Sequence, residues 1–103
     1  MTMPHTLVVL PSAKSDLQSA VIWYEDKQIG LGRRFKLEVI NSIDSLNNPL
    51  KEYSPALLNL SRIFVKNFPY IIYFKKDISR QRIVVYAILH EKQDRDVILK
   101  GRL

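Results

Sequence analysis

The chain has 103 residues, of which 47% are hydrophobic and 25% charged, and its formal net charge is +6. This length and balance fit one domain over residues 1–103 and exclude a disordered or low-complexity chain. No apolar run reaches the roughly 18 residues of a membrane span, the N-terminus lacks the basic leader of a signal peptide, and the chain has no cysteine, so we expect a cytoplasmic protein with no membrane association and no cofactor.

The first half of the chain predicts a short strand followed by two helices. The apolar run at residues 6–10 is typical of a strand, and a helix is expected to begin at Ser12 or Ser15. The segment 30–32, with two glycines, breaks the helical pattern, and the turn-forming residues 47–49 end a second helix. Each helix has apolar residues at helical spacing: Leu17, Ala20, Val21 and Tyr24 in the first, and Phe35, Val39, Ile43 and Leu46 in the second.

The second half predicts an antiparallel meander after a loop at residues 50–59. The segments 61–66, 70–75 and 82–90 are rich in β-branched and aromatic residues and are joined by short connectors. The order β-α-α-β-β-β indicates an α+β fold, in which a helix hairpin packs on one face of a mostly antiparallel four-stranded sheet.

Strict alternation along each strand separates a helix-facing side from an outer side. The helix-facing set is predicted to contain Ile63, Val65, Ile83, Val85, Ala87 and Leu89. The outer set is predicted to contain Arg62, Phe64, Lys66, Arg82, Val84, Tyr86, Ile88 and His90. Both faces of the segment 70–75 are apolar, so alternation alone does not orient this strand; we assign Ile71, Tyr73 and Lys75 to the outer set. An outer face of this kind either docks a partner, is covered by the C-terminal segment 97–103, or mediates dimerisation.

The net positive charge comes entirely from the second half of the chain. Residues 1–61 hold six basic and six acidic side chains, whereas residues 62–103 hold ten basic and four acidic ones and so carry the whole excess. A one-sided positive field favours a polyanion or an acidic protein as partner.

The chemistry-bearing residues of the sheet half are cations and one imidazole. No metal site is expected, because His5 and His90 are far apart in sequence and neither has a ligand motif beside it. RNA cleavage without a metal needs a base, an acid and cations around the phosphate, and His90, Arg62 and Arg95 could supply them. The alternative is structural: Arg62 pairs within the fold, His90 packs at a strand end, and Arg95 is solvated.

Several short motifs follow one another over residues 6–95: Ala13 with Asp16-Leu17, Trp23-Tyr24-Glu25, Gly30-Leu31-Gly32 with Arg34-Phe35, Leu46 to Pro49, Arg62, residues 68–73, and Ile83 to His90. In this order and spacing the chain resembles the RelE/ParE superfamily of toxins, of the plasmid stabilization type. The resemblance implies the toxin of a type II toxin–antitoxin system, neutralised by a cognate acidic antitoxin, with a possible homodimer or a hetero-oligomer with that antitoxin.

The resemblance leaves three functions open. RelE-like members cleave mRNA on the ribosome, and here Arg62, His90 and Arg95 or Lys92 would be the catalytic residues of an endoribonuclease. ParE-like members bind and poison DNA gyrase without catalysing a reaction. This branch is favoured, because Tyr70 stands where a RelE-type arginine is expected. The third possibility is an inactive antitoxin- or nucleic-acid-binding module. The residues expected to bind a partner are Phe64, Lys66, Tyr73, Arg82, Tyr86 and Lys92.

Overall fold

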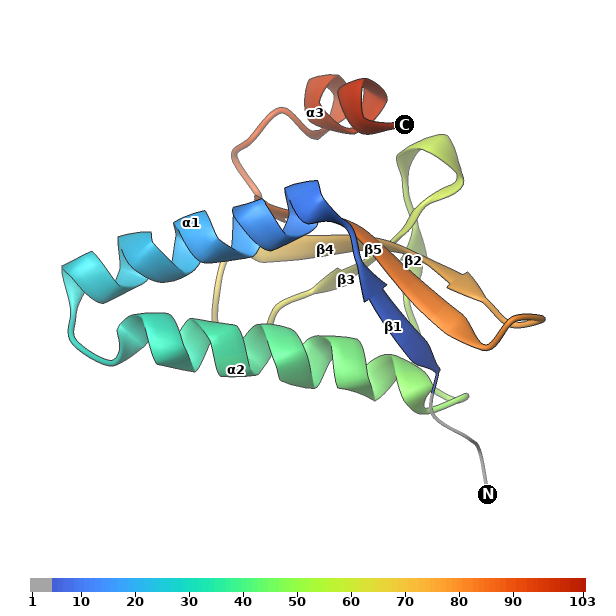
Figure 1. Cartoon of the computed structure of the whole chain (residues 1–103), viewed down its shortest axis with the longest axis horizontal. Helices are drawn as coiled ribbons and strands as arrows, with labels where there is room; N and C mark the ends of the chain where they lie inside the picture. Colours follow the sequence, from blue (N-terminus) through green and yellow to red (C-terminus); the bar gives the residue numbers. More distant parts are fainter. Residues whose placement is uncertain (1–4) are drawn as a thin grey trace.

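The computed structural model describes residues 5–103 and has the predicted α+β architecture, with a helix hairpin packed against a sheet (Figure 1). None of the helices in this part of the chain is long and apolar enough to cross a membrane. The elements in chain order are β1 (Thr6–Val9), α1 (Pro11–Lys27), α2 (Leu31–Asp44), the 3-10 turn η1 (Ser45–Asn47), β2 (Ser54–Pro55), η2 (Leu57–Asn59), β3 (Ser61–Phe64), β4 (Tyr70–Asp77), β5 (Arg82–His90) and α3 (Arg95–Arg102).

The sheet has five strands in the order β1-β5-β4-β3-β2, one more than predicted. β1 runs parallel to β5, and the other neighbours are antiparallel. The additional strand β2 lies in the predicted loop 50–59 and has only two residues, which pair with Ser61 and Arg62. A two-residue strand that contains a proline shows no alternation, so sequence periodicity does not reveal it.

The helix hairpin owes its shape to Pro11 and to the turn between the helices. Pro11 occupies the first turn of α1, where its missing N–H costs nothing, so the helix begins there rather than at Ser12 or Ser15. In the turn, Gly30 has a φ of +87°, which glycine adopts without strain. The Glu25 carboxylate accepts hydrogen bonds from the N–H groups of Gly30 and Gly32, at 2.8 and 3.0 Å. These bonds satisfy donors at the start of α2 that no helical carbonyl can reach.

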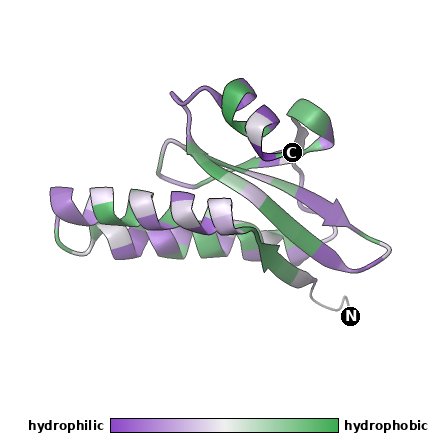
Figure 2. Ribbon diagram, turned by 45° about the horizontal axis from the view of Figure 1, so that its top comes forward, coloured by the Kyte–Doolittle hydropathy of each residue, from purple (hydrophilic) through white to green (hydrophobic). Residues whose placement is uncertain are grey.

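The main core lies between the hairpin and one face of the sheet (Figure 2). The helices contribute the buried side chains Ala13, Ala20, Tyr24, Phe35, Val39 and Ile43, and the strands contribute Ile63, Ile72, Phe74, Ile83, Val85 and Ile88. The predicted helix-facing positions are therefore confirmed for β3 and for the first half of β5.

The second half of β5 reverses the predicted faces. The β4–β5 register shifts between Tyr73 and Phe74, and Tyr86 is the extra residue of the resulting bulge. Beyond it Ala87 faces away from the helix hairpin, and so does Leu89, whereas Ile88 faces the hairpin. The prediction for these three residues, and for His90, which lies on the hairpin side with Ile88, was wrong because it assumed unbroken alternation.

The C-terminal segment folds back over the other face of the sheet as helix α3. Leu99 of α3 is fully buried in a second core with Leu60, Ile71, Tyr73, Ala87 and Leu89, and the turn η2 closes its border. Of the alternatives that the sequence leaves open, self-coverage is therefore confirmed for this part of the outer face.

Candidate functional site

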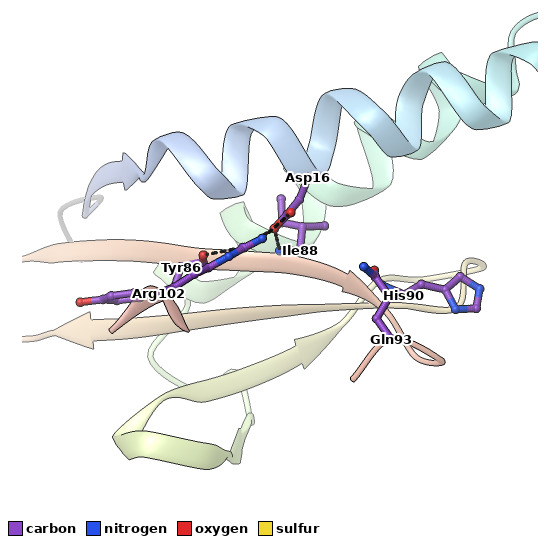
Figure 3. A network of polar contacts seen from close by, with 6 residues as sticks. All are labelled: Asp16, Tyr86, Ile88, His90, Gln93 and Arg102. Carbon is purple, nitrogen blue, oxygen red and sulfur yellow. Dashed lines mark hydrogen bonds and ion pairs between the residues drawn. The ribbon is translucent and has the colours of Figure 1, made fainter. Parts of the chain in front are cut away.

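The edge of β5 beyond β1 is closed by side chains rather than by another strand. β1 pairs only as far as Val85, while β5 continues to His90. Asp16 of α1 accepts a hydrogen bond from the Ile88 N–H at 3.0 Å, and Arg102 of α3 donates to the Tyr86 carbonyl at 3.2 Å (Figure 3). Asp16 and Arg102 also form a two-bond ion pair at 2.6 and 2.8 Å, and this pairing raises the pKa of the guanidinium.

His90 lies in a cleft of about 440 Å³ between α1 and the end of β5. Its ring meets the ring of Tyr70 edge to face at 5.2 Å, and its Nδ1 accepts a hydrogen bond from the Lys92 N–H at 3.0 Å. The neutral ring therefore carries its hydrogen on Nε2. Burial raises the pKa of the Tyr70 hydroxyl, so this group stays protonated. The cleft is lined by Ser15, Asp16, Ser19, Ala20, Trp23, Tyr70, Ile88, His90 and Gln93.

The other two candidate catalytic residues lie elsewhere. Arg62 is on β3 next to Ile63, which faces the hairpin, so Arg62 is on the opposite face of the sheet from the His90 cleft. Its guanidinium lies 5.6 Å from the Phe64 ring, and its buried Nε finds no hydrogen-bond partner among residues 5–103. Arg95, whose side chain is 47% exposed, begins α3 and contacts Asp96. Arg62 and His90 therefore do not share a site.

The predicted binding residues do not gather in one place. Arg82 and Tyr86 lie on β5, and the Lys75 ammonium is 5.3 Å from the Tyr86 ring centre. Phe64 and Lys66 line a separate cleft of about 310 Å³ that also touches the C-terminal half of α2.

Lys92 lies in the exposed turn before α3. Tyr73 is only 1% exposed beneath the α3 cover, so the prediction that it lies on an accessible surface was wrong. Tyr73 does face away from the helix hairpin, as assigned, although the sequence pattern did not orient this strand and contains no information about the segment that covers it.

Sequence reasoning missed an apolar groove on the outer side of the helix hairpin. This groove, of about 330 Å³, is lined by Lys14, Leu17, Gln18, Val21, Ile22 and Lys36. Ile22 is 62% exposed, although an isoleucine in a helix would ordinarily face a core. The signal in the sequence is that Ile22 lies off the core stripe of α1, and that a lysine from each helix borders the same stretch. We call this the hairpin groove.

Between residues 5 and 103, no three histidine or acidic side chains gather closely enough to hold an ion.

The chain was compared with known proteins. A family model described as ParE toxin of type II toxin-antitoxin system, parDE, matches residues 7–95. A solved structure of the chromosomal ParDE toxin–antitoxin system from P. aeruginosa is similar in fold, with a TM-score of 0.66 and 15% sequence identity. The similarity covers 84% of this chain and 95% of that one. The search of curated proteins gave no match.

Proposed function

The chain belongs to the ParE toxin family of type II toxin–antitoxin systems, and from this membership we propose that it arrests growth by binding DNA gyrase, without chemistry of its own. The observation that carries the non-enzymatic branch is that Arg62 and His90 lie on opposite faces of the sheet. A metal-free ribonuclease must place its base and its phosphate-binding cations around one reacting phosphate. Here His90 faces the hairpin side of the sheet, and Arg62 lies on the opposite side.

Gyrase inhibition is tested directly with the purified chain. Plasmid supercoiling by gyrase should fall, or cleaved DNA should accumulate, as the chain is added. The variant Arg62→Ala should inhibit to the same extent and should arrest growth as the wild type does, because a mechanism without catalysis needs no cation at a reacting phosphate. Codon-phased mRNA ends in primer extension from arrested cells, together with loss of toxicity in Arg62→Ala, would instead favour the RelE-like endonuclease.

The hairpin groove is the surface that we propose for the antitoxin. Its floor is apolar, with Leu17, Val21 and Ile22, and its borders carry Lys14 and Lys36. Such a groove complements an amphipathic helix that has acidic residues beside its apolar face. An acidic antitoxin segment that is disordered alone would fold as it binds there.

Charge reversal at the groove borders tests this assignment. The variant Lys14→Glu/Lys36→Glu should bind the antitoxin at least tenfold more weakly, as measured by calorimetry, because two attractive contacts become repulsive. Arg33→Glu/Arg34→Glu is the matched control: it makes the same change in net charge on exposed positions at the start of α2. Equal weakening in both variants would show that net charge, rather than the groove, determines binding.

A further inference from the structure

The hairpin that joins β4 to β5 is a strongly basic segment of the chain. Residues 75–82 contain four cations, Lys75, Lys76, Arg80 and Arg82, and one carboxylate, Asp77. The hairpin projects from the sheet at the end of the molecule opposite the turn between α1 and α2 (Figure 1). The strands are hydrophilic where they enter the turn (Figure 2). The gyrase and antitoxin proposals give this segment no role.

The single carboxylate of the hairpin is used internally. Asp77 Oδ1 accepts hydrogen bonds from the Ser79 hydroxyl at 2.8 Å and from the Arg80 N–H at 3.1 Å. Its Oδ2 lies 3.8 Å from Arg80 Nε and 3.9 Å from Arg82 Nε. Asp77 therefore fixes the turn and holds two arginines beside it, and the remaining charge of the segment is positive.

The cations occupy both faces of the hairpin. Lys75 lies on the α3 side, over Tyr86, whereas Lys76 lies on the side of the helix hairpin and donates a hydrogen bond to the Leu46 carbonyl at 2.6 Å. Arg80, with 69% of its side chain exposed, stands at the tip. Next to it, Ile78 is 74% exposed in the turn, where no neighbouring apolar residue shields it.

We propose that this hairpin, residues 75–82, inserts into a groove of duplex DNA. A groove has phosphates along both walls, which matches cations on both faces of a ribbon, whereas an acidic protein surface would meet only one face. An exposed aliphatic side chain at the tip of a basic ribbon can wedge between base steps, and Ile78 has this position. The inference goes beyond the proposed function, because it requires neither gyrase nor antitoxin.

The test measures binding of the full chain, made by cell-free synthesis, to a labelled duplex of about 20 base pairs. Fluorescence anisotropy over a range of salt should give a log–log slope between about −2.7 and −3.6, the value for three to four phosphate contacts. Lys75→Gln/Arg80→Gln should reduce the slope by about 1.8 and weaken binding at least tenfold at low salt. The control Arg33→Gln/Arg34→Gln removes the same charge at the opposite end and should bind as the wild type does.

Three results would overturn the proposal. They are no duplex binding at low salt, equal loss in the two paired variants, and displacement of the duplex by polyglutamate at an equal concentration of charge. Circular dichroism checks that each variant is folded. Ile78→Ser tests the wedge separately: it should weaken duplex binding while leaving the salt slope unchanged, because no phosphate contact is lost. Unchanged affinity would show that Ile78 does not insert between base steps, and it would thereby contradict insertion of the hairpin into a groove.

Discussion

Gly32 shows how one side chain position can decide the geometry of the helix hairpin. A β-carbon at Gly32 would fall on the Val21 carbonyl oxygen of α1 and within 3.0 Å of the Glu25 side chain. The obstacle is backbone, which cannot rotate away as a side chain could. The two helices therefore approach closely at this point because residue 32 has no side chain, and Glu25 can reach the N–H groups of the turn.

Replacing Gly32 by alanine should accordingly be costly. We expect Gly32→Ala to lower the free energy of unfolding by about 3 kcal/mol, since the crowding of a tightly packed interior typically costs about 1–3 kcal/mol and here the helix axes must move apart. Gly101→Ala is the control: no atom lies within 4 Å of a β-carbon there, and alanine favours the helix by roughly 0.5 kcal/mol. Urea unfolding measures both, and equal stability of the two variants would contradict the close approach.

Two tyrosines make the fold sensitive to alkaline pH. Burial raises the pKa of Tyr24 and of Tyr70 above the ordinary value of 10.0, and the proximity of Tyr24 raises that of Tyr70 further. A group whose pKa is raised by folding contributes stability that is complete below its unfolded pKa and is lost as the pH rises through its folded pKa. The free energy of unfolding should therefore fall above pH 10.

The variant Tyr24→Phe/Tyr70→Phe tests this titration. Its stability should decline less steeply than that of the wild type above pH 10, because phenylalanine has no proton to lose. Between pH 7 and 9 the difference between the two proteins should stay constant. Parallel decline at alkaline pH would show that other groups dominate the titration.

At the scale of elements, two side chains attach α3 to the rest of the fold: Arg102 through hydrogen bonds and Leu99 through apolar packing. Arg102 joins α3 to α1 through Asp16 and to β5 through the Tyr86 carbonyl, while Leu99 fills the second core. Arg102 and Asp16 are 21% and 14% exposed, so the pair is screened much less than a surface ion pair. Loss of Arg102 removes two hydrogen bonds from the Asp16 carboxylate and one from the Tyr86 carbonyl.

Removal of the Arg102 side chain should weaken the attachment of α3 to the rest of the fold. Arg102→Ala should reduce the free energy of unfolding by about 2 kcal/mol, between the values for exposed and for buried pairs. Arg95→Ala removes an arginine from the same helix, but its contact with Asp96 is exposed, and the loss should stay below about 0.5 kcal/mol. A double-mutant cycle with Asp16→Ala should give a coupling energy above 1 kcal/mol; additive losses would mean that the ion pair contributes nothing.

The strands β4 and β5 could be predicted from the sequence in part, whereas α3 could not. The strand 82–90 and its pairing with 70–75 could be predicted because β-branched residues and short connectors have a strong local signature. The bulge at Tyr86 could not, since it depends on how β4 and β5 fit together and not on either strand alone. Neither could α3, an eight-residue helix with one fully buried side chain, Leu99, whose placement is decided by a long-range contact.

The residue types of the candidate site were predictable, but the face of the sheet on which each residue lies was predictable only in part. Alternation placed Arg62 on one face of β3 correctly, but it could not show that His90 belongs to the opposite face, because the bulge lies between the start of β5 and His90. The hairpin groove escaped prediction because Leu17 and Val21 were assigned wholly to the core, whereas both are only partly buried at its border and also line the groove.

At the scale of the whole molecule, the sheet separates two cores of unequal size. Among residues 5–103, fourteen buried residues form the core under the helix hairpin, whereas six form the core under α3. Local opening of a native protein costs least where the fewest apolar contacts are broken. The smaller core should therefore open first, and the helix hairpin with the centre of the sheet should open last.

Native-state hydrogen exchange should resolve this order. Backbone amides of α3 are expected to exchange at least tenfold faster than those of β5, which exchange only on global unfolding. Leu99→Ala should accelerate exchange in α3 and η2, because it empties the smaller core, and should change the relative protection of α1 and α2 little. Val97→Ala is the control in the same helix, since Val97 is 68% exposed. Protection of α3 equal to that of β5 would mean that the two cores unfold as one cooperative unit, and that the second face of the sheet is as firmly covered as the first.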